Sequence, residues 1–132
     1  MHSNDKDNIL ITTLKGPIDL ATVKFATWIN VRCFSELDHT EIGCIFVLDK
    51  SMRVTADALD YYDHILKRHK EDLDKKVSVA YVVPLELEGR SLTSRLLSEI
   101  YATYHIPFQV FEKLDDAREW LTSLMISERA VN

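Results

Sequence analysis

The chain has 132 residues, 46% of them hydrophobic, with 16 basic against 21 acidic side chains. This length fits one domain with a core of its own, and so large an apolar fraction excludes an intrinsically disordered chain. The net charge of −5 argues against a general nucleic-acid binder, and no apolar run approaches the length of a membrane span. We expect residues 1–8 to form a polar N-terminal tail that is no signal peptide, and residues 9–132 to form a single domain.

The first predicted element is a strand over Ile9–Lys15, whose mixture of apolar residues and threonines is typical of a pleated surface. Gly16 and Pro17 end this strand. A helix is predicted from about Asp19, a favourable N-cap residue, to about Leu37.

An unbroken apolar run, Ile45–Leu48, dominates the second predicted strand, Cys44–Asp49, as expected of a strand covered on both faces. After a polar turn, apolar residues recur at helical spacing from Ala58, which predicts a helix to about Asp74. A strand, a short loop and a helix in this order form half of a right-handed crossover unit.

The rest of the chain continues this alternation. The remaining predicted elements are, in order, a strand over Val77–Val83, a loop over Pro84–Arg90, a helix that Ser91 can cap and that extends through Tyr104, a strand over Phe108–Phe111 and a helix from Leu114 to about Arg129. Trp120 and Leu121 of the last helix are expected to be buried against the sheet. Strands that alternate with helices throughout indicate an α/β fold with a mostly parallel sheet.

Several short motifs, taken in their order, resemble one known family. They are Ile9–Asp19, Phe46–Leu59, Val79–Pro84 and Phe108–Phe111 with the helix segment Asp115–Leu121. They resemble the STAS superfamily, the fold of anti-sigma-factor antagonists, and within it the SpoIIAA-like group: a strand ending in Gly-x-Leu-Asp, a strand with an Asp-x-Ser turn and helix start, and the closing strands and helix. The resemblance implies a four-stranded, mostly parallel sheet in the order 2-1-3-4, with helices on both faces.

The start of the second helix departs from that family. Antagonists of the family carry Asp-Ser-Ser-Gly there, and a partner kinase phosphorylates the second serine. The corresponding tetrad in this chain is Thr55-Ala56-Asp57-Ala58, so Asp57 replaces the phosphorylated serine. A carboxylate imitates a phosphate poorly, and although Ser51 and Thr55 remain as nearby hydroxyls, we expect the protein to function without phosphorylation.

Residues that could carry catalysis or bind metal have simpler interpretations. Asp38, His39 and Glu41 have the composition of a surface turn. Cys33 and Cys44 lie in apolar stretches without metal or redox spacing, which predicts buried thiols and a cytoplasmic location. The sequence contains neither a glycine-rich phosphate loop nor a nucleophile-elbow serine. We therefore expect no enzyme, no cofactor and no metal.

The first helix carries apolar residues on more than one side. At 100° per residue, one face holds Phe25, Ala26, Ile29 and Cys33, and a largely opposite face holds Leu20, Val23, Val31 and Phe34. A helix that covers one face of a sheet needs a single apolar stripe. The surplus indicates a subunit partner, a bound apolar ligand or a neighbouring helix. We expect Val31 and Phe34 to border either a dimer contact or an apolar pocket shared with the third helix.

These patterns leave two functions open. The first is a binding protein that holds an apolar small molecule or lipid beside the first three helices, with delivery at a membrane surface as one variant. The second is a regulatory protein–protein module, for which a homodimer is an alternative arrangement; nucleic acid is excluded as a partner. A strand order of 2-1-3-4 reverses direction between strands one and three, so a crevice is expected at the carboxyl ends of the strands. The predicted binding residues there and beside the helices are Gly16, Pro17, Asp49, Ser51, Thr55, Asp57, Pro84, Arg90, Val31, Phe34, Leu96 and Tyr101.

Overall fold

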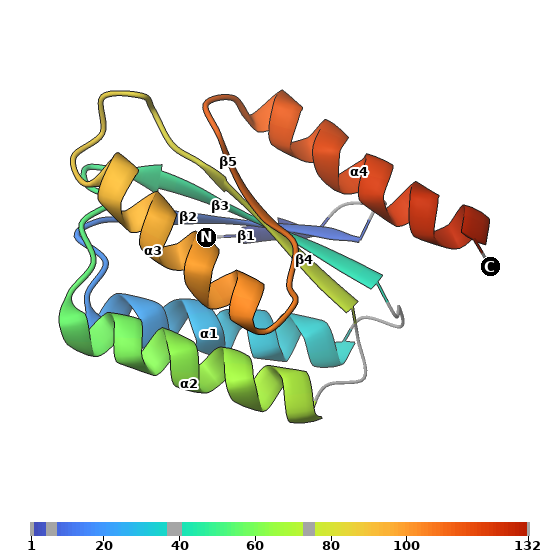
Figure 1. Ribbon diagram of the computed structural model, residues 1–132, viewed down its shortest axis with the longest axis horizontal. Coiled ribbons are helices and arrows are strands. Elements are labelled where there is room, and N and C mark those ends of the chain that lie inside the picture. Colours follow the sequence, from blue (N-terminus) through green and yellow to red (C-terminus); the bar gives the residue numbers. More distant parts are fainter. Residues whose placement is uncertain (1, 5–7, 37–40, 73–75, 132) are drawn as a thin grey trace.

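The computed structural model describes residues 2–4, 8–36, 41–72 and 76–131, with side chains at 8–28, 30, 41–68 and 76–125. Its elements, in chain order, are β1 (His2–Asn4), β2 (Ile9–Lys15), α1 (Leu20–Glu36), β3 (Glu41–Asp49), α2 (Ala56–Asp72), β4 (Lys76–Val82), α3 (Arg90–Thr103), β5 (Phe108–Phe111) and α4 (Leu114–Val131) (Figure 1). Four parallel strands alternate with four helices, which confirms the predicted α/β class. Within the described ranges, no helix has the length and apolar character needed to cross a membrane.

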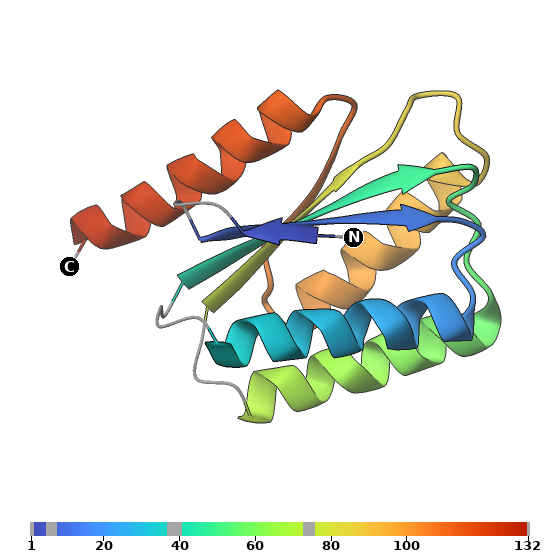
Figure 2. The ribbon, with the colours of Figure 1, turned by 180° about the vertical axis from the view of Figure 1, so that it is seen from behind.

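All five strands form one sheet in the order β1-β2-β3-β4-β5. β2 to β5 run parallel to their neighbours, whereas β1 is antiparallel to β2 and extends the sheet on that side (Figure 2). The predicted order 2-1-3-4 is therefore wrong, because the four predicted strands lie across the sheet in the order 1-2-3-4. The prediction also missed β1, which lies in the segment expected to be a polar tail; His-Ser-Asn has no apolar alternation to reveal a strand.

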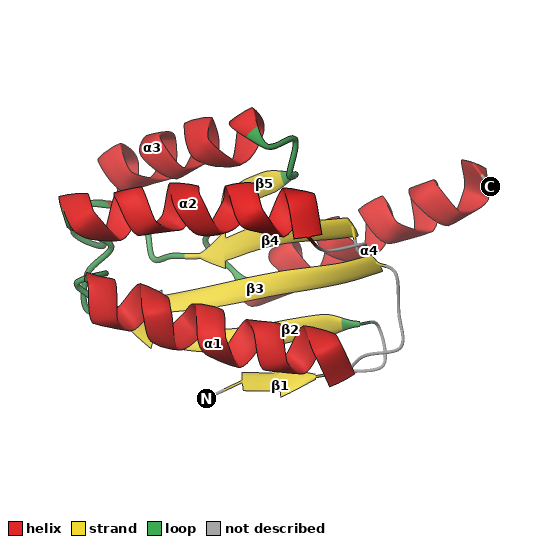
Figure 3. Ribbon diagram, turned by 90° about the horizontal axis from the view of Figure 1, so that it is seen from below, coloured by secondary structure: helices red, strands yellow, loops and turns green. Residues whose placement is uncertain are grey.

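The strand order decides where the helices lie. Successive right-handed crossovers that advance in one direction across a sheet place their helices on the same face. α1, α2 and α3 accordingly cover one face (Figure 3), and α4, which follows the last strand, covers the other face (Figure 1). The parallel strands never reverse direction across the sheet, as the order 2-1-3-4 would have required.

Alternating side chains along each strand divide the core into two layers. In β3, Cys44, Phe46 and Leu48 belong to the layer under α1, α2 and α3, whereas Ile45 belongs to the layer under α4. The same alternation holds in β4, where Tyr81 faces the three helices and Ala80 faces α4. This is the pleat of a strand buried on both faces, and it explains the continuous apolar run in the sequence.

α4 covers its face of the sheet with a narrow stripe. Ala117, Leu121 and Met125, spaced four residues apart, are buried against the strands. The helix approaches β3 closely, since a Cβ atom added to Gly43 would lie 3.1 Å from Leu121 Cδ1. Leu121 is buried as predicted, whereas Trp120 is only half-buried, with its ring 5.6 Å from that of Phe111.

The starts of two helices test the predicted caps. The backbone N–H of Thr22 donates a hydrogen bond to Asp19 Oδ1 over 2.9 Å, which confirms Asp19 as the cap of α1. The same bond lowers the pKa of Asp19 from its ordinary value. The predicted cap Ser91 is wrong, because α3 already begins at Arg90 and its N-cap is Gly89, with a φ of 81°.

Among the described side chains of α1, the buried positions form one stripe. Val23 and Ala26, three residues apart, are both buried, so the prediction that placed them on different faces is wrong. Phe25 and Trp28 are 55% and 56% exposed, so part of the apolar surplus of this helix faces solvent. Four of the apolar residues of this helix, Ile29, Val31, Cys33 and Phe34, have side chains outside the described set.

Candidate functional site

Several predicted site residues lie together at the carboxyl end of the sheet. Gly16 and Pro84 follow the parallel strands β2 and β4, so they lie at the same edge. The N–H of Gly16 donates to the carbonyl oxygen of Asp49 over 2.8 Å. A Cβ atom added to Gly16 would lie 1.7 Å from the carbonyl oxygen of Ser51. The loops after β2 and β3 are therefore in direct contact, with no room for a side chain at Gly16.

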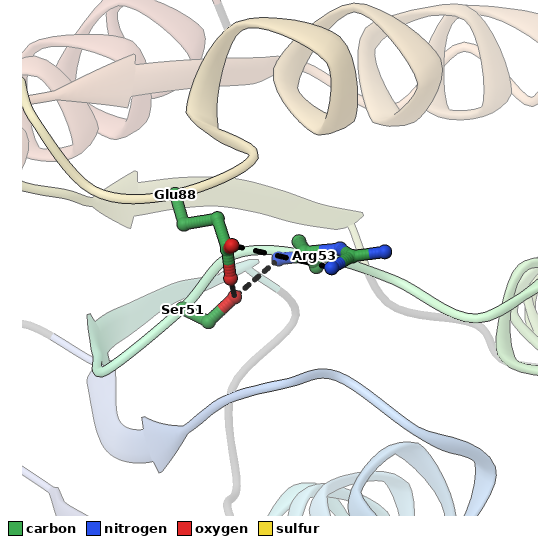
Figure 4. Close-up of polar contacts among 3 residues, drawn as sticks. All are labelled: Ser51, Arg53 and Glu88. Atoms are coloured by element: carbon green, nitrogen blue, oxygen red, sulfur yellow. Dashed lines mark hydrogen bonds and ion pairs between the residues drawn. The ribbon is translucent and has the colours of Figure 1, made fainter.

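Ser51 joins the loop after β3 to the loop after β4 (Figure 4). Its hydroxyl donates to Glu88 Oε1 over 3.0 Å and accepts the N–H of Arg53 over 3.0 Å. The N–H of Met52 also donates to the carbonyl oxygen of Glu88, over 2.7 Å. The side chains of Arg53 and Glu88 lie 4.0 Å apart but are 70% and 62% exposed, so their ion pair is weak. Sequence reasoning missed both residues, because only the fold brings these two loops together.

Other predicted residues of this edge make local contacts. Thr55 Oγ1 accepts the N–H of Ala58 over 3.3 Å and donates to Asp57, which makes Thr55 the cap of α2. Arg90 Nε donates to the carbonyl oxygen of Val83 over 3.3 Å. The predicted residues that are exposed at this edge are Pro17, Asp49, Thr55, Asp57 and Pro84.

The contacts at this edge make it a structural junction. A crevice at the carboxyl ends was expected from a reversal of strand direction, and the observed order contains none among the parallel strands. Ser51 is only 6% exposed, and its hydroxyl already donates one hydrogen bond and accepts another. That hydroxyl therefore faces the neighbouring loop rather than solvent. The expectation that the protein functions without phosphorylation stays a prediction.

A cavity of about 80 Å³ lies on the three-helix face, toward the amino ends of β3 and β4. Its wall is mainly apolar, with side chains from the sheet, from α2 and from the segment after α3: Phe46, Ile65, Leu66, Val77, Val79 and Ile106. Four polar or weakly polar side chains of the described set also line it: Asn30 of α1, Cys44 of β3, Tyr62 of α2 and Tyr101 of α3. Cys44 is buried, as predicted. Among the predicted site residues whose side chains are described, Tyr101 is the one that lines this cavity.

Three tyrosines from three different elements meet beside the cavity. The Tyr62 hydroxyl is hydrogen-bonded to the Tyr81 hydroxyl and, over 2.7 Å, to the Tyr101 hydroxyl. Aromatic contacts hold the group, since the Tyr101 ring stacks on Phe108 with centroids 4.7 Å apart. Burial raises the pKa of Tyr62 and holds the pKa values of Tyr81 and Tyr101 well above the usual value. All three phenols are therefore neutral hydrogen-bond donors at physiological pH.

Asn30 adds a buried acceptor to this cavity. Its side chain is 9% exposed, and Oδ1 has no hydrogen-bond partner among the described atoms. An unpaired buried acceptor costs stability, and most such groups in proteins are paired. The cavity thus combines apolar walls with one acceptor that lacks a donor.

The cavity residues left a signal in the sequence that the predictions did not use. Asn30 follows Val23 and Ala26 at helical spacing, so an amide occupies a position of the buried stripe. Tyr62 and Tyr101 likewise lie on helix faces that otherwise bury aliphatic residues. Leu96, predicted as a site residue, is half-buried and does not line the cavity, and the side chains of Val31 and Phe34 lie outside the described set.

The described part of the chain contains no group of three or more histidine, cysteine, aspartate or glutamate side chains placed to hold a metal ion. Asp38 and His39 of the turn considered above lie outside the described residues.

Comparison with known proteins assigns no family. No protein-family model, no curated protein and no solved structure matches the chain. The established architecture is an α/β fold in which four parallel strands alternate with four helices.

Proposed function

We propose that the protein is a non-enzymatic binding protein that holds a small, mainly apolar molecule beneath α1, α2 and α3. The observation that carries this proposal is the cavity of about 80 Å³ among their side chains. Protein interiors contain few voids larger than a water molecule, and a cavity costs stability because its lining loses contacts. A ligand that fills the cavity restores those contacts.

The size of the cavity limits what it can hold. A water occupies about 30 Å³ in the liquid, so the space takes two or three waters or a similar number of ligand atoms. A ligand of about three non-hydrogen atoms gains at best about 4.5 kcal/mol, which corresponds to a Kd of about 0.5 mM. We therefore assign the cavity to one end of a longer molecule, whose remaining part leaves through the open side.

A relation to the STAS superfamily and its SpoIIAA-like group is part of this proposal. The order of the motifs along the chain and the alternation of parallel strands with helices support it. The burial of Ser51 and the presence of Asp57 at the start of α2 favour a member of that kind that works without a phosphoserine. In this scheme the carboxyl edge holds the loops together, and the cavity holds the ligand.

Xenon is a direct probe of the apolar cavity, because it needs space but no hydrogen bonds. We expect xenon NMR to detect binding to the wild type and a loss of binding in Cys44→Leu, whose larger side chain fills the space. Ile45→Leu is the matched control, because residue 45 faces α4 and the change conserves volume. Native mass spectrometry of freshly purified protein should also reveal a co-purified molecule that is lost in Cys44→Leu. Xenon binding that is absent in the wild type, or equal in the two variants, would contradict the proposal.

A second candidate function, the regulatory protein–protein module, is favoured by the aromatic surface of α1. Phe25 and Trp28 are both more than half exposed and lie one turn apart on that helix. Contiguous apolar surface often marks a contact with another protein. If a second copy of this chain is that partner, light scattering should show a dimer that Phe25→Ser and Trp28→Ser weaken at least about tenfold. A wild type that stays monomeric at all concentrations would exclude this dimer.

A further inference from the structure

We propose that the cavity receives the hydroxyl end of a neutral aliphatic molecule. This inference rests on the proposed function and adds the chemical class of the ligand. It follows from the polar side chains that line the cavity: one of them needs a hydrogen-bond donor from the ligand, and another needs a hydrogen-bond acceptor.

The first requirement is a hydrogen-bond donor. Asn30 lines the cavity, and its Oδ1 is a buried acceptor that has no hydrogen-bond partner in the described part of the chain. An ether, a halide or a hydrocarbon would leave this oxygen unpaired, and burying it further would weaken binding. The ligand must therefore carry an O–H or N–H group.

The second requirement is an acceptor. Tyr62, Tyr81 and Tyr101 have three hydroxyl hydrogens, and the two hydrogen bonds among them use two. When Tyr81 donates to Tyr62, the remaining hydrogen belongs to Tyr62 or to Tyr101, and both of these residues line the cavity. One hydroxyl group of a ligand can donate to Asn30 and accept from a tyrosine, so it meets both requirements.

The walls exclude a charged end. Among the described side chains, the lining includes no lysine, arginine, aspartate or glutamate that could neutralise a buried ion. Because burial raises the pKa values of the tyrosines, they stay neutral and provide no counter-charge. A carboxylate or an ammonium group would lose its hydration without compensation, whereas an alcohol replaces a water in this space hydrogen bond for hydrogen bond.

Two probes of equal length separate the hydroxyl from the apolar chain. 1-Hexanol and 1-fluorohexane have the same number of non-hydrogen atoms, but fluorine cannot donate to Asn30. We expect the wild type to bind 1-hexanol about tenfold more tightly, as measured by titration in ¹H–¹⁵N NMR spectra, which is the factor that one hydrogen bond typically contributes. The side-chain amide signal of Asn30 should shift with 1-hexanol, and hexanoate should bind more weakly than either probe.

Two variants assign the preference to the cavity. In Asn30→Leu, which replaces the amide by an apolar side chain of similar shape, the preference for 1-hexanol should fall below about twofold while 1-fluorohexane still binds. Tyr101→Phe should also reduce the preference for 1-hexanol over 1-fluorohexane. This second variant allows the same test to be made if Asn30→Leu does not fold. Tyr104→Phe is the matched control: its hydroxyl donates to Asp63 at the surface over 2.9 Å and does not line the cavity.

The outcomes distinguish the inference from the proposed function. Equal affinity of the wild type for the two hexyl probes, or tighter binding of 1-fluorohexane, would overturn the hydroxyl assignment and leave an apolar site. Tighter binding of hexanoate would also overturn it, in favour of an anionic end. Binding of neither xenon nor either hexyl probe to the wild type would refute the proposed function, and the hydroxyl assignment with it.

Discussion

The two ends of the three-helix face differ in how their buried polar groups are satisfied. At the carboxyl end, the Ser51 hydroxyl donates to Glu88 and accepts from Arg53, and the backbone of Gly16 is paired with that of Asp49. Toward the amino end, Asn30 Oδ1 has no partner among the described atoms. Buried polar groups in proteins are normally paired. The region near Asn30, where one buried acceptor has no hydrogen-bond donor, is therefore a better candidate for a ligand site than the carboxyl end, where the polar groups named above are paired. The proposed ligand site at the cavity is therefore distinguished from the loop junction at the carboxyl end by an unpaired buried acceptor, and not by its position in the sheet topology.

The two ends also differ in how tightly they are packed, and the carboxyl end is the tighter one. At the carboxyl end, loops approach so closely that Gly16 has no space for a Cβ atom, and a Cβ atom on Gly89 would lie 2.8 Å from the N atom of Arg53. Beneath the helices, a cavity of about 80 Å³ remains. Substitutions that add atoms should therefore be costly at the junction and tolerated, or even favourable, at the cavity. The following four changes test this contrast.

The largest effect is expected at Gly16. Gly16→Ala places a methyl group 1.7 Å from the carbonyl oxygen of Ser51, so the two loops must separate. We expect the free energy of unfolding to fall by about 3 kcal/mol or more in urea titrations. Gly43→Ala is the control: its Cβ atom meets the flexible end of Leu121 at 3.1 Å, and a loss near 1 kcal/mol is expected. Equal losses in the two variants would mean that the carboxyl edge is no more tightly packed than the α4 interface.

Ser51→Ala should have the next largest effect. It removes a hydroxyl that makes two hydrogen bonds and leaves the N–H of Arg53 without its acceptor. Stability should fall by about 2 kcal/mol, measured by urea unfolding. Arg53→Gln, which removes only the exposed ion pair with Glu88, should change it by less than about 0.5 kcal/mol. The reverse ranking would show that charge rather than the Ser51 hydroxyl joins the loops.

The tyrosine group should appear in the pH dependence of stability. Burial holds the pKa values of Tyr81 and Tyr101 well above 10.0 in the folded protein, whereas in the unfolded chain they return to about that value. Above pH 10 the unfolded chain therefore binds fewer protons, so the free energy of unfolding falls as pH rises, by up to about 1.4 kcal/mol per pH unit for each phenol. Urea titrations between pH 8 and 11 test this, and Tyr101→Phe should make the decline shallower. An unchanged slope in Tyr101→Phe would contradict burial of that hydroxyl.

Asn30→Leu should have the smallest effect on stability, and its sign is informative. It removes an unpaired buried acceptor and adds apolar contacts, so the free energy of unfolding should stay the same or rise by up to about 1 kcal/mol. Asn30→Asp has a similar shape but buries a charge, and it should lower stability by more than about 2 kcal/mol at pH 7. A large loss of stability in Asn30→Leu would mean that the amide already has a partner in the native protein.

Local signals made much of the fold predictable. The strand Ile9–Lys15 and the strand Phe108–Phe111 have the predicted ends, and Asp19 caps α1 as predicted, because apolar periodicity and cap chemistry act within a few residues. The cap of α3 was missed because Gly89 offers no side-chain signal, only a backbone conformation that glycine adopts easily.

Strand order and the site depend on contacts that no local pattern encodes. The order across the sheet is set by packing between elements far apart in the chain, and the resemblance to a known family supplied the wrong one. The crevice expected at the carboxyl ends was derived from that order and lost its topological basis with it, whereas the binding residues expected there stay a prediction. Tyr101 was predicted for its apolar helix position, whereas Asn30, Tyr62 and Tyr81 gain meaning only where α1, α2, α3 and β4 meet.

The arrangement of the helices also bears on how the chain folds as it is synthesised. Each of α1, α2 and α3 can dock as soon as its neighbouring strands are made, because elements adjacent in sequence are adjacent in the sheet. The opposite face, with Ile9, Ile45 and Ala80, is covered by α4, which follows every strand in the chain. A nascent chain that ends before Leu114 therefore presents one finished face and one bare apolar face, the kind of surface that aggregates or recruits chaperones. Emergence of α4 from the ribosome is the step that ends this exposure.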